Sequence, residues 1–453
     1  MSTSEIRLPF AAIVLAMLPA VLDQTILATA LPTIASDLGR VTQVSWLVAV
    51  YVVCATAATP LWGKLADRRS RKRLLQLALA AFVTASALCG AAQDLTQLLI
   101  VRGVQGVAAG GLMTLAMTAV GDLVEPRQRG RYQGYIAAVF AAATVLGPLL
   151  GGLLTDHVSW RVLFYVNVPL GVAALAALSA TLPTVAPARA RSRLDLLGAT
   201  LLVGATTALM LGCLWAGERV ALLAAAAVLT IVLGAHIRRT ADPIVPAAML
   251  RTRAVAVASA GLFLGTAALF AVVTFVPTFL KVTTGASPTD AGLLLVPMML
   301  ATTLATNLAG RHIARTGRYA ALPPTGLAIM GVALLALALG ASEHSRLTTE
   351  LALVPFGLGF GLTSQVFIVA VQGAVERREL GTATSLTGFF RALGGAVGAA
   401  TLGALFSAHA GTGGAGDITE AAQAVFLAGG LVALVGAVVA LALPNTSLSP
   451  VAA

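Results

Sequence analysis

An aspartate, Asp23, lies in the middle of the first long apolar run of the sequence, and it is the only acidic residue deep in any such run. A carboxylate at the centre of a bilayer costs roughly 2.5 to 3.5 kcal/mol on insertion scales, so residues of this kind normally face a bundle interior or a water-filled cavity and are functional. The chemistry open to a lone carboxylate is the binding and release of a proton. Asp23 is therefore the first candidate site residue.

Arg102, in the fourth apolar run, is the cation at a depth comparable to that of Asp23. A nearby positive charge favours the charged form of a carboxylate, whereas desolvation favours the neutral form. Two interpretations stay open: Asp23 is protonated and deprotonated in a working cycle, or it forms a permanent ion pair with Arg102. We favour the proton carrier, because all the histidines fall in loops or at the ends of apolar runs: His157, His236, His312, His344 and His409.

The elements that position these residues are membrane helices. The chain has 453 residues, of which 58% are hydrophobic and 10% charged, whereas soluble domains carry about 25% charged residues. A helix needs roughly 20 apolar residues to cross a bilayer, and continuous runs of this length exclude the alternating strands of a barrel. We place spans near residues 9–31, 44–63, 74–92, 98–121, 131–155, 162–182, 196–214, 220–237, 254–280, 288–310, 320–341, 350–372, 382–407 and 422–443. The prediction is an all-α integral membrane protein with fourteen transmembrane helices.

Basic residues orient these helices, because short cytoplasmic loops carry an excess of Lys and Arg. With the N-terminus inside, most of the 29 basic residues are cytoplasmic: Arg7, Lys64 to Arg73, Arg127 to Arg131, Arg189 to Arg193, Arg238 to Arg253, Arg311 to Arg318, and Arg377 with Arg378. The external ones are Arg40, Arg161, Arg219, Lys281 and Arg346. This alternation predicts two cytoplasmic termini. The excess of Ala, Gly and Arg over Lys suggests a GC-rich bacterial genome, and hence a multi-pass protein of the bacterial cytoplasmic membrane.

The predicted spans divide the chain into three parts. An N-terminal six-helix half covers residues 1–183, a linker with two inserted helices covers 184–253, and a C-terminal six-helix half covers 254–453. The loop Gly63 to Arg71 after the second span is similar in sequence to the loop Gly310 to Arg318 after the tenth. Transporters built from two repeats show such internal similarity, and they bind their substrate at the midplane between the halves.

Several motifs occur in order along the chain. They are Leu22-Asp23-Gln24-Thr25-Ile26 with Leu31-Pro32; Gly63 to Arg73, with Ser70 where Gly is usual; Arg102, Gln105 and Gly106; Gly147-Pro148-Leu149-Leu150-Gly151-Gly152; Trp160-Arg161, Phe164, Asn167, Pro169 and Gly171; and Gly381-Thr382-Ala383-Thr384 with Phe390-Arg391 and Gly394-Gly395. With these motifs the chain resembles the major facilitator superfamily, and within it the fourteen-helix drug:proton antiporter branch. The resemblance covers nearly the whole chain and implies proton-coupled export of small lipophilic or cationic drugs and antibiotics.

The antiporter motif contains Gly147, Pro148, Gly151 and Gly152. Glycines at helical spacing leave a strip without side chains, so that another helix can approach closely, and the proline favours a bend. The resemblance implies that this stretch packs one half against the other and prevents a leak, while ordinary small-residue packing is the alternative. Gly394, Gly395 and Gly398 occupy the corresponding place in the second half, which favours an interface between the halves.

The gating loop motif contains Gly63, Asp67, Arg68, Arg71 and Lys72. Its cations orient the protein, but Asp67 is not needed for that purpose. Its carboxylate is free to pair with Arg68 or Arg71 or to face the positive N-terminal end of a helix. The resemblance implies that this helix begins near Gly381 and that the contact holds the cytoplasmic side closed in one state. The second copy has Ala314 in place of Asp67, so the contact is expected on one side only.

The sequence indicates no catalytic centre, no metal site and no ATP-binding motif. Cys54, Cys89 and Cys213 lack metal-ligand spacing, and the charges behind the net +11 are spread over loops rather than gathered on a nucleic-acid-binding face. We therefore expect no enzyme activity and no cofactor. The expected partners are protons, a small-molecule substrate and the lipid bilayer, with no nucleic acid, and the expected functional unit is a monomer driven by the proton gradient.

Amide and aromatic side chains at membrane depth are the candidates for the wall of the substrate cavity. They are Gln24, Trp46, Phe270, Phe275, Asn307, Gln365 and Gln372. Packing or helix-to-helix hydrogen bonding is the alternative role of each.

Two alternative functions remain open. Proton-coupled import of a metabolite uses the same fold and the same Asp23, although the glycines at 147–152 argue against it. The second alternative is a non-transporting receptor or scaffold, which would give the buried Asp23 and Arg102 no function.

Overall fold

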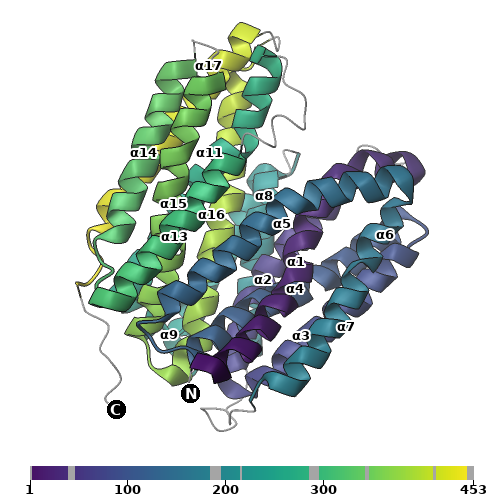
Figure 1. Ribbon diagram of the computed structural model, residues 1–453, viewed down its shortest axis with the longest axis vertical. Helices are drawn as coiled ribbons and strands as arrows, with labels where there is room; N and C mark the ends of the chain where they lie inside the picture. The colour runs from purple at the N-terminus through teal and green to yellow at the C-terminus, as the bar shows by residue number, and fades with distance from the viewer. Residues whose placement is uncertain are drawn as a thin grey trace. The chain divides into compact units, whose positions relative to one another are not determined.

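The computed structural model describes residues 3–38, 46–183, 195–214, 217–284, 295–341, 346–411 and 415–445. Within these ranges the chain is helical and contains no strand (Figure 1). Thirteen of the described helices are long and apolar enough to cross a membrane. Of the fourteen predicted spans, the one at 288–310 corresponds to a less apolar helix, Val296–Thr316, and its first residues lie outside the described ranges. The count of fourteen therefore stays a prediction.

The chain divides into two compact units. Unit 1 comprises Met1–Val124, Val139–Ala247 and Val375–Phe389, and unit 2 comprises Glu125–Ala138, Ala248–Ala374 and Phe390–Ala453. Unit 1 contains α1 (Thr3–Leu38), α2 (Trp46–Arg68), α3 (Arg71–Ala91), α4 (Leu95–Leu123), α6 (Trp160–Tyr165), α7 (Asn167–Thr181), α8 (Leu196–Leu214) and α9 (Arg219–Arg239). Unit 2 contains α10 (Ala247–Arg251), α11 (Arg253–Thr284), α13 (Val296–Thr316), α14 (Leu322–Gly340), α15 (Arg346–Ala374) and α17 (Ala415–Ala440). Helices α5 (Arg129–His157) and α16 (Leu380–His409) contribute to both units.

The predicted three-part division stays a prediction, and the compact units group the helices as follows. The inserted helices α8 and α9 belong to the same unit as the first six spans. In addition, the first turns of α5 pack within unit 2, where a side chain on Gly130 would meet Gly310 of α13, and the first turns of α16 pack within unit 1. The predicted basic linker at 184–193 and the predicted external Arg40 lie outside the described residues.

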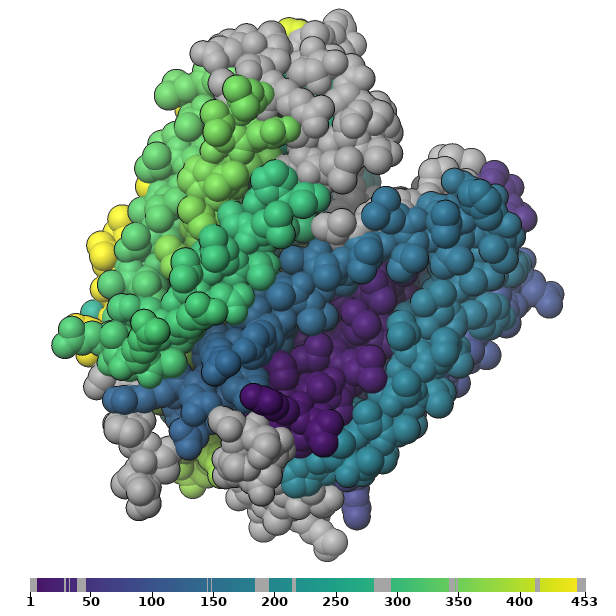
Figure 2. Space-filling model, viewed as in Figure 1, coloured from purple at the N-terminus to yellow at the C-terminus, as the bar shows by residue number. Residues whose placement is uncertain are grey.

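The core of unit 1 forms around α1. Buried residues of α1 such as Ile26 and Ile34 pack with Leu98 of α4 and with Trp160 and Phe164 of α6. Helix α1 is visible between α5 and α7 in Figure 2, and α3 and α7 lie side by side in Figure 1. This arrangement surrounds the middle of α1 with protein.

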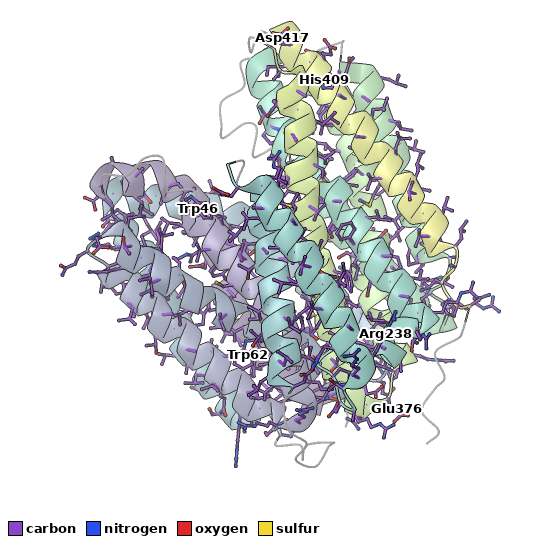
Figure 3. All side chains as sticks on the ribbon, turned by 180° about the vertical axis from the view of Figure 1, so that it is seen from behind. Trp46, Trp62, Arg238, Glu376, His409 and Asp417 are labelled. Atoms are coloured by element: carbon purple, nitrogen blue, oxygen red, sulfur yellow. The ribbon has the colours of Figure 1, made fainter. Side chains whose placement is uncertain are left out.

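Helices α2 and α4 approach each other closely because α4 has glycines on the shared face. A Cβ on Gly106 would lie 3.0 Å from the Tyr51 Cα, and one on Gly110 would lie 3.1 Å from the Ala55 carbonyl carbon. Figure 3 labels Trp46 at the start of α2 and Trp62 further along the same helix. Close backbone contact of this kind is typical of membrane helices with small residues. It brings the α2 side chains within reach of Arg102.

Unit 2 packs α14 against α15 and α17, and α11 against α15 and α17. The α16 glycines that we associated with an interface between halves contact α11 of the same unit: Gly394 meets Phe263, and Gly398 meets Ala267. His409, the last residue of α16, and Asp417, in the first turn of α17, lie at the same end of unit 2 in Figure 3.

The hairpin of α8 and α9 is held at its ends by two carboxylates. Asp195 accepts hydrogen bonds from the backbone N–H of Gly198 at 2.8 Å and of Ile244 at 3.2 Å, and the His236 Nε2 lies 2.8 Å from its Oδ1. Burial raises the pKa of Asp195, but these hydrogen bonds outweigh it, so that the pKa lies below its usual value. Asp195 thus stays ionised at neutral pH and caps the start of α8. The second carboxylate is Asp242, which follows α9 and pairs with Lys64 and Arg68 at the end of α2.

Candidate functional site

Asp23 lies in the middle of α1 with 4% of its surface exposed. Its Oδ2 atom is 2.6 Å from the Nη1 atom of Arg102, which is 1% exposed. Two buried opposite charges at this distance form a hydrogen-bonded ion pair. The structure thus brings together the two residues that the sequence singled out, from α1 and α4.

Three amide and hydroxyl side chains continue this pair into a network. The Oδ1 atom of Asp23 accepts hydrogen bonds from the Gln105 Nε2 at 3.2 Å and from the Asn167 Nδ2 at 3.4 Å. Asn167 also donates to the Ser86 hydroxyl at 3.0 Å, and that hydroxyl donates to the Phe164 carbonyl at 2.8 Å. Both oxygens of Asp23 are therefore hydrogen-bonded, as expected for a charged carboxylate kept away from water.

Arg102 has further acceptors that do not depend on Asp23. Its Nη1 atom donates to the Gln105 Oε1 at 2.8 Å, and its Nε atom donates to the Leu47 carbonyl at 3.4 Å. The guanidinium also lies 4.3 Å from the centroid of the Tyr51 ring, a cation–π contact. These contacts hold Arg102 through α2 and α4 as well as through Asp23 of α1.

The antiporter motif packs against α1 at Thr25, two residues after Asp23 in the sequence. A Cβ on Gly147 of α5 would lie 2.6 Å from the Thr25 Cβ of α1, and the Thr25 hydroxyl donates to the Ala143 carbonyl at 3.2 Å. Gly151 is buried, whereas a Cβ on Gly152 would meet nothing within 4 Å. The glycine that matters for the contact between α1 and α5 is therefore Gly147. Pro148 also lies within α5.

Asp67 lies at the end of α2 and caps the start of α16. Its Oδ1 atom accepts the backbone N–H of Gly381 at 2.7 Å, and its Oδ2 atom accepts the N–H of Thr382 at 2.9 Å and the hydroxyl of Thr382 at 2.6 Å. A carboxylate in this place satisfies amides that have no partner in the helix and faces the positive end of its dipole. Gly63, one turn earlier, makes room for this contact because a side chain there would meet Ser385.

The cations of the same motif bind different segments of unit 1. Arg71 lies 3.5 Å from Asp67 and forms a shorter ion pair with Asp122 at the end of α4. Arg68 and Lys64 both pair with Asp242 at 2.6 Å, so Arg68 is not the partner of Asp67. Lys72 donates to the Ser179 carbonyl of α7 at 2.8 Å. The end of α2 thus joins α16 and the segment after α9, and the start of α3 joins α4 and α7.

Comparison with known proteins shows the family. A family description of the major facilitator superfamily matches residues 13–399. The chain belongs to the major facilitator superfamily. An uncharacterized MFS-type transporter of Mycobacterium tuberculosis is 38% identical over 406 residues, which cover 88% of this chain and 59% of that protein. The multidrug transporter protein MdtP of Bacillus subtilis is 32% identical over 410 residues, which cover 88% of this chain and 75% of that protein.

Solved structures of this superfamily share the fold. The human organic anion transporter MFSD10 matches with a TM-score of 0.71 and 18% identity, over 97% of this chain and 100% of that chain. The proton:xylose symporter XylE matches with a TM-score of 0.67 and 15% identity, over 95% of both chains. This major facilitator protein is thus a multi-pass membrane protein, and multidrug transporters are among its relatives.

The substrate-cavity candidates of this major facilitator protein fall in both units. In unit 1, Gln24 is exposed and Trp46 begins α2. In unit 2, three candidates are used in packing or in hydrogen bonds within a helix: Phe275 stacks on Phe406 at 5.0 Å between ring centroids, a Cβ on Gly395 would lie 2.8 Å from the Phe270 ring, and Asn307 donates to the Thr303 carbonyl at 2.8 Å. The backbone carbonyl of Gln372 accepts a hydrogen bond from Arg129 at 2.9 Å. The Gln365 Oε1 is buried without a hydrogen-bond partner among the described residues.

Sequence reasoning missed three site residues. Tyr51 and Ser86 are ordinary members of apolar spans, and only the tertiary contacts reveal that they touch Arg102 and Asn167. Asp242 lies in a basic linker, and a single acidic residue next to Pro243 could have indicated a partner for the basic residues. The basic residues clustered at the end of α2 needed such a counter-ion.

Proposed function

We propose that this protein is a proton-coupled antiporter that exports small lipophilic or cationic compounds, such as antibiotics, by alternating access, with Asp23 as the proton carrier. The observation that carries the proposal is the buried pair of Asp23 and Arg102, 2.6 Å apart, in a chain whose relatives include multidrug transporters. Titratable groups inside the membrane mark proton and substrate pathways in transporters.

Protonation of Asp23 gives the site two arrangements. In the charged state Asp23 binds Arg102 and the amides of Gln105 and Asn167. A neutral carboxyl attracts Arg102 less, and the guanidinium then relies on the Gln105 Oε1 and the Leu47 carbonyl. We assign to this exchange of partners the bias between the two states of the transporter, because a bound proton shifts a conformational equilibrium only through a difference in interactions.

The export direction rests on two supports. The multidrug relatives are about 30% identical to the chain over most of its length. The antiporter motif packs on the helix that carries Asp23, through Gly147 and Thr25, which suits a tight contact between α5 and α1. In the same proposed mechanism, Asp67 binds the start of α16 in one state of the transporter and releases it in the other.

The proton gradient is the proposed energy source, without ATP or a cofactor. One proton that enters down a potential of about 100 mV and a gradient of about one pH unit supplies roughly 2.3 and 1.4 kcal/mol. A total of about 3.7 kcal/mol sustains a several-hundred-fold gradient of a neutral substrate. We further propose a monomer in the bacterial cytoplasmic membrane, with both termini in the cytoplasm.

Substrate-induced proton release tests this function. The protein is reconstituted with a pH-sensitive dye, ethidium is added, and wild type is compared with Asp23→Asn. We expect wild type to release protons on addition of ethidium and the variant to release at least about tenfold fewer. If Asp23→Asn couples protons normally, Asp23 is not the carrier. Counterflow in everted vesicles distinguishes export from import.

A further inference from the structure

Arg391 is a cation in the middle of α16. Twelve residues into this 30-residue helix, it lies about 16 Å along the axis from Leu380, at a rise of 1.5 Å per residue. Its side chain is half-buried. A guanidinium stays charged at every accessible pH, so Arg391 places a permanent charge at membrane depth in unit 2.

The charge of Arg391 is not neutralised by the parts of the chain that the structure describes. Arg391 makes no hydrogen bond, ion pair or ring contact with these residues. The described carboxylates of unit 2 are Glu125, Glu350, Asp417 and Glu420, which all lie before a helix or within its first two turns. Arg102 in unit 1 shows the contrast, because its carboxylate and amide partners surround it.

The surroundings of Arg391 along α16 are apolar and aromatic. Gly394 and Gly395, three and four residues later, share its helical face by spacing and contact α11 at Phe263 and Phe270. Phe390 and Phe270 are half-buried. A guanidinium beside such residues suits a carboxylate carried on an apolar or aromatic body, since the planar fork binds a carboxylate through two parallel hydrogen bonds.

We propose that Arg391 is a substrate-binding residue that takes the carboxylate of a lipophilic organic acid. This inference rests on the proposed function and replaces its broad substrate class, lipophilic or cationic compounds, with lipophilic compounds that carry an acidic group. Export of a monoanion in exchange for one proton moves two charges in the direction that the membrane potential favours, whereas exchange of a cation for a proton moves none. Carboxylate transport should therefore respond to the potential much more strongly.

Three probes with the same ring system test the proposal: 2-naphthoate, neutral 2-naphthamide and 2-naphthylmethylammonium. Binding to the full-length purified protein is measured for wild type, Arg391→Gln, Arg391→Lys and, as a control, Arg315→Gln, which removes an exposed arginine of α13. We expect 2-naphthoate to bind wild type and Arg315→Gln at least about tenfold more tightly than 2-naphthamide does. Arg391→Gln abolishes this preference, Arg391→Lys keeps part of it, and 2-naphthamide binding stays unchanged, which shows that the variant is folded.

The outcomes separate the two proposals. Equal binding of 2-naphthoate and 2-naphthamide to wild type, or an unchanged preference in Arg391→Gln, overturns the role of Arg391. In proteoliposomes, 2-naphthoate transport should fall several-fold more than 2-naphthylmethylammonium transport when the potential is collapsed with valinomycin and potassium. Normal proton coupling in Asp23→Asn instead contradicts the proposed function and leaves the binding result at Arg391 intact.

Discussion

At the scale of single residues, the buried pair of Asp23 and Arg102 determines the cost of a change at either position. We expect Asp23→Asn to lower the free energy of unfolding by about 3 kcal/mol or more, because it leaves the guanidinium of Arg102 buried with an incomplete set of acceptors. Thermal unfolding in detergent measures this loss. The double variant Asp23→Asn with Arg102→Gln should recover part of it, and a double variant less stable than Asp23→Asn would contradict the ion pair.

A second prediction at this scale concerns Asn167. Its Nδ2 donates to Asp23 and to Ser86, while its Oδ1 is buried without a hydrogen-bond partner. Asn167→Leu removes a donor to a charged group, which is worth about 1.5 to 3 kcal/mol, so substrate-induced proton release should slow about tenfold or more. Ser86→Ala removes only the outer contact and should have a smaller effect. Equal effects of the two variants would place Asn167 outside the proton site.

Residue types explain which parts of this site the sequence could predict. Asp23 and Arg102 are rare at membrane depth, so their positions alone marked them, and the structure places them in contact. Gln105 and Asn167 were visible as motif members, but their bonds to Asp23 depend on the rotation of α4 and α7 about their axes. The sequence of a buried helix does not show how the helix is rotated about its axis, because apolar residues cover all its faces.

At the scale of elements, the antiporter motif makes a prediction that distinguishes its glycines. Gly147→Ala should reduce transport and destabilise the protein by about 1 to 3 kcal/mol, because the new methyl group pushes α5 away from Thr25 beside Asp23. Gly152→Ala is the matched control, since a Cβ there meets nothing within 4 Å. Transport assays and thermal unfolding of the two variants provide the comparison. A deleterious Gly152→Ala with a neutral Gly147→Ala would rule out this packing account.

The cap that Asp67 provides for α16 is a second prediction about elements. Asp67→Ala leaves the N–H groups of Gly381 and Thr382 without their acceptor, and loss of a helix cap costs about 0.5 to 2 kcal/mol. We expect a lower unfolding temperature and slower transport. Asp67→Asn keeps one acceptor oxygen and should be milder in stability. An unchanged transport rate in Asp67→Ala would contradict the proposed gate at this position.

Element order was predictable, but element grouping was not. Hydropathy placed the spans because a helix must be apolar over about 20 residues to cross a bilayer. The association of α8 and α9 with unit 1 depends on specific polar contacts, such as those of Asp242 with Lys64 and Arg68, which connect residues more than 170 positions apart. Likewise, α13 is less apolar than its neighbours and is not among the thirteen described helices that are apolar enough to cross a membrane, although the apolar run at 288–310 predicted a span there.

At the scale of the whole molecule, the two units carry different kinds of charge at membrane depth. Unit 1 holds a neutralised pair in which the carboxylate can accept a proton, and unit 2 holds Arg391, whose charge is permanent and unpaired within the described residues. This asymmetry agrees with the two proposals made above, proton binding at Asp23 in the first unit and substrate binding at Arg391 in the second. The sequence repeat alone does not predict it, because the repeat concerns loops and not these central positions.

The proton-driven cycle leads to a prediction about energy sources. A neutral substrate such as 2-naphthamide gains about 3.7 kcal/mol per proton when both a potential of about 100 mV and one pH unit are present, and about 1.4 kcal/mol when only the pH gradient remains. Collapse of the potential should therefore lower its steady-state gradient in proteoliposomes roughly fiftyfold, and collapse of the pH gradient about tenfold. Valinomycin with potassium and nigericin impose these conditions separately. A gradient that survives both treatments would exclude the proton as the coupling ion, since neither component of its driving force would then remain.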